Sequence, residues 1–152
     1  MMSGFSRDRR RALGVALAAF IGGGLALGAA GAASAQDPRT TTVQRVAREW
    51  LQLTDKLDSA ASYRAAGARF RRSMSLDKWS ERLRGERMSL GGMQQRAVLQ
   101  TSFEKSFPGV PDGEYALVLF RASFALRTDV HETVTLERGA DGAWHVIGYS
   151  IR

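Results

Sequence analysis

The sequence predicts an α+β fold, in which three N-terminal helices pack on a four-stranded antiparallel sheet. Between residues 43 and 92, apolar side chains recur at steps of three and four, which is the period of an amphipathic helix. After Gly92 the period changes to two, and short turns rich in Gly, Pro and Asp separate four alternating stretches. Neither layer can bury its apolar side alone, so we expect the helices to cover one face of the sheet.

Three stretches carry the helical pattern, and they are residues 43–57, 63–74 and 76–90. A threonine at position 41 or 42 can cap the first helix, and Ser75 can cap the third. Gly67 lies inside the second stretch, where a glycine weakens the helical pattern. Trp50 and Trp79 fall on the apolar faces of the first and third helices and are expected in the core.

Four stretches carry the strand pattern, and they are residues 94–107, 114–128, 130–138 and 143–152. In the first strand, the alternation places Leu99 with Thr101 and Phe103 on one face. In the second, Leu117 and Leu119 make half of the outer face apolar as well as the inner one. A second copy of the chain, another protein or the polar residues before the first helix could cover that outer face. A homo-oligomer formed through these leucines is therefore one expected assembly.

The first 35 residues have the pattern of a secretory signal peptide. Four arginines among residues 7–11 precede an uncharged stretch, residues 12–35, which ends in Ala33-Ser34-Ala35. Such a small-x-small motif predicts cleavage between Ala35 and Gln36 and a periplasmic or secreted protein. An uncleaved membrane anchor is the alternative, because the uncharged stretch could span a bilayer. General secretory and twin-arginine export both stay open. Residues 36–42 are polar and are expected to form a disordered leader, before a single domain over residues 43–152.

Basic charge is concentrated in one part of the predicted mature chain. Residues 36–152 hold 18 basic and 14 acidic side chains, a net charge of +4. Between Arg64 and Arg96 there are nine basic residues and three acidic ones, a local excess of +6. This excess indicates either a solvated helical face or a surface that attracts anionic envelope material. The candidate anionic-surface patch is Arg64, Arg71, Arg72 and Arg84.

Patterns of catalytic or metal-binding residues are missing from the sequence. It contains no cysteine, which excludes a thiol enzyme and a cysteine-ligated metal. His131 and His145 have no third ligand at a zinc-site spacing. No nucleophile elbow, phosphate loop or nucleic-acid recognition motif appears. We therefore expect no metal, no cofactor and no nucleic acid, and a non-catalytic binding or interaction domain of the bacterial envelope.

A small enzyme or ligand carrier is the alternative function, with a cavity between helices and sheet. The candidate lining residues are Trp79, Arg87, Arg96, Tyr115, Glu132 and Tyr149. Titratable groups that converge on one open pocket would favour an enzyme. Arg87 and Arg96 paired with carboxylates such as Glu132, without an open cavity, would favour a structural role. Trp79 and Trp144 are likewise either core residues or the lining of a cavity.

An ordered series of motifs resembles a family of exported bacterial proteins catalogued as domain of unknown function 4019. The series consists of Trp50-Leu51, Trp79, Arg87, Leu90-Gly91, Arg96, Pro108-Gly109, Pro111, Gly113, Tyr115, Glu132-Thr133, Asp141-Gly142, Trp144, Val146 and Gly148-Tyr149. The resemblance covers roughly residues 43–152. Tyr63 stands where the family is expected to have tryptophan, and Arg127 where it is expected to have lysine. The resemblance implies an exported domain with a cystatin-like or NTF2-like layout, and it implies no activity.

Overall fold

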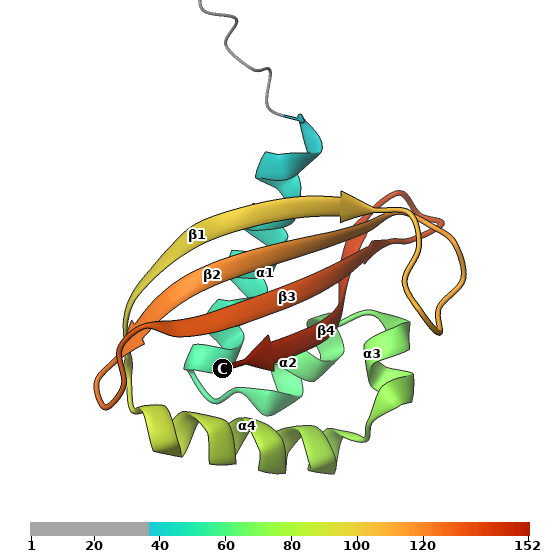
Figure 1. Ribbon diagram of the computed structural model, residues 1–152. Helices are drawn as coiled ribbons and strands as arrows, with labels where there is room; N and C mark the ends of the chain where they lie inside the picture. The colour runs from blue at the N-terminus through green and yellow to red at the C-terminus, as the bar shows by residue number, and fades with distance from the viewer. Residues whose placement is uncertain (1–36) are drawn as a thin grey trace, which may run out of the picture. The chain divides into compact units, whose positions relative to one another are not determined.

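The computed structural model describes residues 37–152, which form a helical layer and one sheet. The helices are α1 (Arg39–Asp55), α2 (Ser59–Ala65), α3 (Ala68–Ser73) and α4 (Leu76–Leu90). The strands are β1 (Met93–Glu104), β2 (Tyr115–Phe124), β3 (Val130–Arg138) and β4 (Trp144–Ile151). They pair in the order β1-β2-β3-β4, always antiparallel. In Figure 1, α2, α3 and α4 lie under the curved sheet and α1 runs behind it, where it contacts all four strands. The predicted α+β meander is confirmed, whereas the predicted signal peptide lies outside the described residues.

Helix α1 begins earlier than the sequence pattern predicts. It starts at Arg39, so residues 39–42, which were expected in a disordered leader, form its first turn. Neither threonine caps it. Instead, the Asp37 carboxylate accepts the backbone N–H of Arg39 at 2.9 Å and also binds the Arg39 guanidinium. A carboxylate just before the first turn satisfies one of the free N–H groups of the helix and favours the positive end of its dipole.

The second predicted helix is divided in two at Gly67. Ala66 and Gly67 are extended, and the Gly67 N–H donates to the Val146 carbonyl of β4 at 2.7 Å. A Cβ at position 67 would lie 3.0 Å from His145 Cβ and 3.2 Å from the Val146 oxygen. Only glycine allows the chain to approach the edge of β4 this closely. The contact separates α2 from α3 and holds both helices beside β4.

Two strand predictions need correction. A bulge between Val98 and Gln100 inserts one extra residue into β1, so Leu99 points outward and is 50% exposed, whereas Thr101 and Phe103, predicted on the same face as Leu99, point inward. Strand β2 ends at Phe124 rather than at residue 128, and Leu126 is 72% exposed. A hairpin needs at least two residues to reverse the chain. Residues 125–129 supply that turn before β3 begins.

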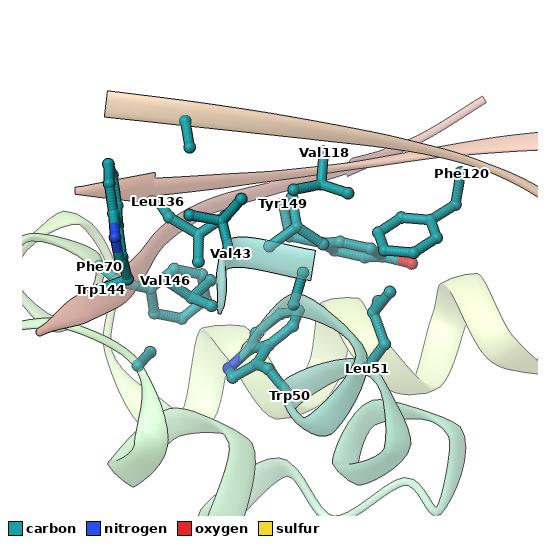
Figure 2. Packing of buried hydrophobic residues seen from close by; sticks show 14 of the residues in the cluster. Val43, Trp50, Leu51, Phe70, Val118, Phe120, Leu136, Trp144, Val146 and Tyr149 are labelled. Carbon is teal, nitrogen blue, oxygen red and sulfur yellow. The ribbon is translucent and has the colours of Figure 1, made fainter. Parts of the chain in front are cut away.

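The core lies between the inner face of the sheet and the helices, and Figure 2 shows its central residues. Trp50 and Trp79 are buried as predicted, and both indole N–H groups donate to Ser62, at 2.8 Å to its carbonyl and 3.0 Å to its hydroxyl. Trp144 packs against Phe103 at the other end, with a ring-centroid distance of 6.0 Å. The tryptophans are therefore core residues, and their polar atoms are satisfied where they are most deeply buried.

The outer face of the sheet carries no helix within residues 37–152 (Figure 1). Leu117 and Leu119 are half-buried there. Tyr115 also lies on this face, buried against Phe107 and donating to the Pro111 carbonyl at 2.6 Å. Self-association through the two leucines stays a prediction, which light scattering on the purified protein would test.

None of the helices among residues 37–152 has the length and the hydrophobicity of a membrane-spanning segment.

Candidate functional site

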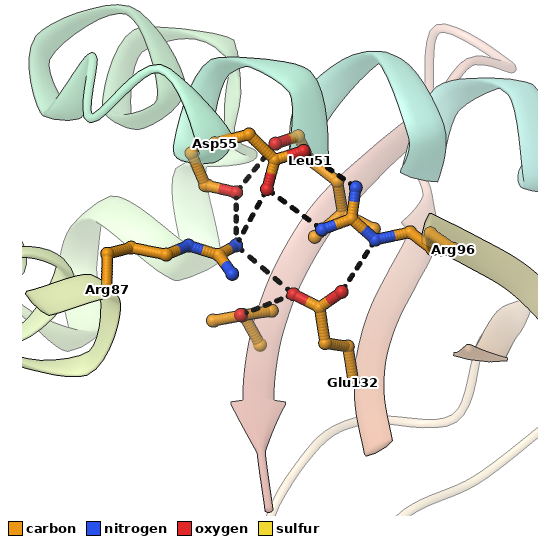
Figure 3. A network of polar contacts seen from close by, with 7 residues as sticks. Leu51, Asp55, Arg87, Arg96 and Glu132 are labelled. Atoms are coloured by element: carbon orange, nitrogen blue, oxygen red, sulfur yellow. Dashed lines mark hydrogen bonds and ion pairs between the residues drawn. The ribbon is translucent and has the colours of Figure 1, made fainter. Parts of the chain in front are cut away.

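A buried ion-pair network joins the helices to the sheet (Figure 3). Glu132 of β3 is fully buried and accepts from Arg96 Nε at 2.6 Å and from Arg87 Nη2 at 3.1 Å. Asp55 accepts two bonds from Arg96, at 2.7 and 2.9 Å, and lies 3.3 Å from Arg87 Nη2. The Tyr149 hydroxyl donates to Glu132 at 2.8 Å. These five residues are called the ion-pair network below; its two positive and two negative charges balance.

Each member of the network comes from a different element and sits on that element's inward face. Arg87 follows Trp79 and Leu83 at helical steps of four along α4. Glu132 alternates with the buried Val130 and Val134 of β3. The ordinary periods of helix and strand therefore carry charged side chains into the core. The network connects α1, α4, β1, β3 and β4 at one place.

The environment of the network fixes the protonation of its donors. Burial alone would lower the pKa of Arg96, but its hydrogen bonds to Asp55 and Glu132 outweigh burial and raise that pKa above the ordinary value. Burial raises the pKa of Tyr149 strongly, and the negative charge of Glu132 raises it further. Tyr149 is therefore held as a neutral phenol that donates its proton to Glu132.

Arg87 is the least satisfied member of the network. Its Nη2 also donates to the Thr54 hydroxyl at 2.9 Å, but its buried Nε and Nη1 have no hydrogen-bond partner among residues 37–152. The guanidinium carbon lies 5.0 Å from the centre of the Phe124 ring and 5.9 Å from that of Tyr149. Aromatic faces attract a cation, so these rings partly compensate the unpaired nitrogens.

The network has the geometry of a structural cluster. Each carboxylate oxygen of Asp55 and Glu132 already accepts at least one contact from an arginine. A cavity of about 240 Å³ borders Asp55 and Arg87, and Leu57, Met88 and Phe124 are among its apolar neighbours. That volume is smaller than the roughly 300–1,000 Å³ of typical ligand pockets. Paired charges beside a small cavity favour the structural role over catalysis.

The candidate pocket residues are thus only partly brought together. Arg87, Arg96, Glu132 and Tyr149 meet in the network, and Trp79 touches it through the Tyr149 ring at a centroid distance of 6.2 Å. Tyr115 lies apart, on the outer face of the sheet. Sequence reasoning missed Asp55 and Thr54. Thr54 lies on the apolar face of the first predicted helix, residues 43–57, and nothing there indicates a polar contact. A single aspartate near the end of a helix, such as Asp55, does not by itself indicate an ion pair.

A second site is a cleft of about 710 Å³ between the α2–α3 segment and the β3–β4 hairpin. The volume is within the range of ligand-binding pockets. The side chains that give it charge are Arg64, Arg69, Arg71, Arg72, Glu137, Arg138 and Asp141, and His145 lies beside them. Five arginines and two carboxylates give a net charge of +3 with a neutral histidine. This site is called the basic cleft below.

Three of the five arginines in the basic cleft form ion pairs or hydrogen bonds with other residues of the chain. Arg69 binds both oxygens of Glu137, at 2.8 and 3.1 Å. Arg138 pairs with Glu114 at 2.8 Å. Arg71 donates to the Arg64 and Ala66 carbonyls. The guanidiniums of Arg64 and Arg72 have no ion-pair partner among residues 37–152, and both side chains are exposed.

The two carboxylates of the basic cleft, Glu137 and Asp141, are ionised and accept hydrogen bonds from neighbouring groups. The hydrogen bond from Arg69 lowers the pKa of Glu137 below its ordinary value. The backbone N–H of Ala143 lowers the pKa of Asp141, and a contact to His145 Nε2 at 2.9 Å adds to the effect. The side of the cleft that the β3–β4 hairpin forms therefore keeps its two negative charges at neutral pH.

The predicted anionic-surface patch is largely part of this cleft. Arg64, Arg71 and Arg72 line it, whereas Arg84 is exposed on α4 away from it. The excess of positive charge between Arg64 and Arg96 in the sequence indicated the side of the cleft that α2 and α3 form. The β3–β4 side of the cleft was missed, because contacts between distant segments, Gly67 with Val146 and Arg69 with Glu137, bring it beside the arginines. Within residues 37–152, no cluster of three or more His, Asp or Glu side chains is placed to hold a metal ion.

Comparison with known proteins gives one match. The family described as "Protein of unknown function (DUF4019)" matches residues 46–149, a span that contains both the ion-pair network and the basic cleft. Nothing matches among curated proteins or among solved structures. The matched span covers more than half of the chain and agrees with the ordered motifs of the sequence. The chain belongs to the DUF4019 family.

Proposed function

We propose that this chain is an exported, non-catalytic binding domain of the bacterial envelope, and that its basic cleft holds anionic material. The observation that carries the proposal is the net charge of +3 in a concave site where Arg64 and Arg72 have no described partner. An exposed guanidinium pairs readily with carboxylate or phosphate, often through two parallel hydrogen bonds. The signal-peptide pattern of residues 1–35 supports export.

The ion-pair network supports the non-catalytic part of the proposal. A catalytic base or acid must have a proton or a lone pair free for the substrate. The carboxylates of the network are instead occupied by guanidinium groups, and Tyr149 keeps its proton. A small enzyme or carrier that uses the space between helices and sheet is the alternative, and it has less support because its candidate residues are paired.

Export can be tested on protein recovered from the envelope fraction of expressing bacteria. We expect mass spectrometry to find a mature N-terminus at Gln36, which follows the Ala33-Ser34-Ala35 motif. Intact Met1 on membrane-bound protein would contradict export with cleavage and favour a membrane anchor.

Anion capture can be tested by binding to two materials, dextran sulfate beads and vesicles of equal parts phosphatidylcholine and phosphatidylglycerol. We expect retention on at least one of them at low salt and release at high salt, because exposed charges are screened by salt. The Arg64→Glu/Arg72→Glu variant should lose retention. The Arg84→Glu/Arg127→Glu variant makes the same charge change outside the cleft and should keep most of it. Equal loss in both variants, or no retention of the wild type, would contradict the proposal.

A further inference from the structure

The two walls of the basic cleft differ in charge. Residues 64–72 form the helical wall, with four arginines and no acidic residue. The hairpin wall presents Glu137, Arg138 and Asp141, which sum to −1. An anionic group bound here is attracted to the helical wall and repelled by the two carboxylates. The cleft therefore orients a ligand, with negative groups toward α2 and α3 and other groups toward the hairpin.

The number of free arginines indicates the number of anionic groups. Arg69, Arg71 and Arg138 are held by Glu137, by backbone carbonyls and by Glu114. Arg64, in the last turn of α2, and Arg72, in the last turn of α3, have no ion-pair partner among residues 37–152 and remain for a ligand. A single anionic group would neutralise only part of a site of charge +3. Two anionic groups would pair with both arginines.

The hairpin wall and the floor indicate what the rest of the ligand is. The ionised carboxylates of Glu137 and Asp141 can only accept hydrogen bonds, so they favour hydroxyl groups. The uncharged lining residues are Ala65, Ala66, Gly67, Ala68, Gly139 and Ala140. None of these offers a large apolar or aromatic surface for a lipid chain or an aromatic ring. A flat membrane also cannot enter a concave site as a small ligand can.

We propose that the basic cleft binds a polyhydroxylated ligand with two anionic groups, which is the chemistry of a sugar bisphosphate or of a short acidic saccharide. The proposal rests on the proposed function, because it names the class of anion that the cleft takes. Arg64 and Arg72 bind the two anionic groups, and Glu137 and Asp141 accept hydrogen bonds from the hydroxyl groups.

Isothermal titration calorimetry on the mature chain tests this proposal with four soluble probes. Fructose bisphosphate and digalacturonate carry two anionic groups on a hydroxylated frame and distinguish phosphate from carboxylate. Inorganic phosphate is a single anionic group without a hydroxylated frame, and fructose is the hydroxylated frame without an anionic group. We expect one of the first two probes to bind at least about tenfold more tightly than phosphate, since a second charge-assisted pair contributes roughly this factor. Fructose should not bind.

Matched variants locate the binding. Arg64→Gln and Arg72→Gln should each weaken binding of the preferred probe by about tenfold, because each removes one charge-assisted pair. Arg84→Gln makes the same charge change on α4 and should change affinity by less than about twofold, as expected for a distant exposed charge. Equal effects of all three variants would overturn the assignment to the cleft.

The proposed function and this inference fail in different ways. Dextran sulfate or the anionic vesicles could bind through Arg64 and Arg72 while neither fructose bisphosphate nor digalacturonate binds. In that case the proposed function is supported and the proposed ligand class is wrong. If phosphate binds as tightly as both dianionic probes, the two-group assignment is wrong. If no anionic material binds at all, both proposals are wrong.

Discussion

Two glutamates on strand β3 show how the same contact serves different purposes. Glu132 and Glu137 each accept hydrogen bonds from arginine on both of their oxygens. Glu132 faces the core and is fully buried, whereas the Glu137 side chain faces the basic cleft and is 27% exposed. Their odd spacing along the strand puts them on opposite faces. In the core, each carboxylate oxygen of Glu132 and Asp55 has an arginine partner; in the cleft, Arg64 and Arg72 have no ion-pair partner among residues 37–152.

Burial, rather than residue type, separates the structural arginines of this chain from those that we propose to bind a ligand. A buried charge must be paired, because its desolvation is otherwise uncompensated. An exposed arginine is solvated by water, so it needs no partner within the protein and is available to bind a ligand. The predictions below follow from this difference.

The largest effect is expected for Glu132→Ala. The change removes one of the two carboxylates that Arg87 and Arg96 share in the core and leaves their charges only partly paired, which should lower the free energy of unfolding by about 3–5 kcal/mol. Glu137→Ala is the matched control on the same strand, and should cost about 0.2–1 kcal/mol, as expected for a partly exposed pair. Urea unfolding of both variants measures the difference. Similar costs for the two would contradict the distinction between the two regions.

Gly67→Ala tests what holds the basic cleft together. The new methyl group would meet His145 Cβ and the Val146 carbonyl, both of which belong to β4. We expect a loss of about 1–3 kcal/mol, the usual range for overpacking a tight contact. Because φ is −68° at this residue, no backbone strain is expected. A thermal melt of the variant with an unchanged midpoint would show that the approach of the two walls is looser than described.

Tyr149→Phe tests the network through pH. The folded-state pKa of Tyr149 is raised, so the folded chain keeps this proton when the unfolded chain loses it, above a pH of about 10. The contribution is present below that pH and is lost as pH rises further, by about 1.4 kcal/mol per pH unit. Stability of the wild type should therefore fall more steeply above this pH than that of the variant. Parallel curves would mean that Tyr149 titrates normally.

The smallest effect on stability is expected for Arg64→Gln and Arg72→Gln. Both side chains are exposed, and neither has an ion-pair partner among the described residues. Each change should alter the free energy of unfolding by less than about 0.5 kcal/mol, as for ordinary surface substitutions. A loss above 1 kcal/mol in chemical denaturation would mean that these arginines are structural, like Arg87 and Arg96.

Much of this comparison could be predicted from local sequence patterns. Helical and strand periods identified the elements, and the charge excess identified Arg64, Arg71 and Arg72. The pairing of Arg87 and Arg96 with Glu132 was one of two alternatives, and the structure shows that pairing. What could not be predicted depends on contacts between distant segments. The bulge between Val98 and Gln100 and the convergence of Asp55 with four other elements arise only when the sheet and helices meet, so no local pattern indicates them. Gly67 weakened the predicted helix, but the contact with β4 that breaks it is not visible in the local pattern.

One measurement tests the separation of the two regions most directly. In a titration of the ¹⁵N-labelled mature chain with fructose bisphosphate, followed by nuclear magnetic resonance, the account predicts salt-sensitive shift changes in residues 64–72 and 137–145. The Arg87, Arg96 and Glu132 signals, and those of Arg84 on α4, should stay in place. Shift changes centred on the ion-pair network, with an unaffected cleft, would contradict the account and indicate that the buried arginines are the binding site.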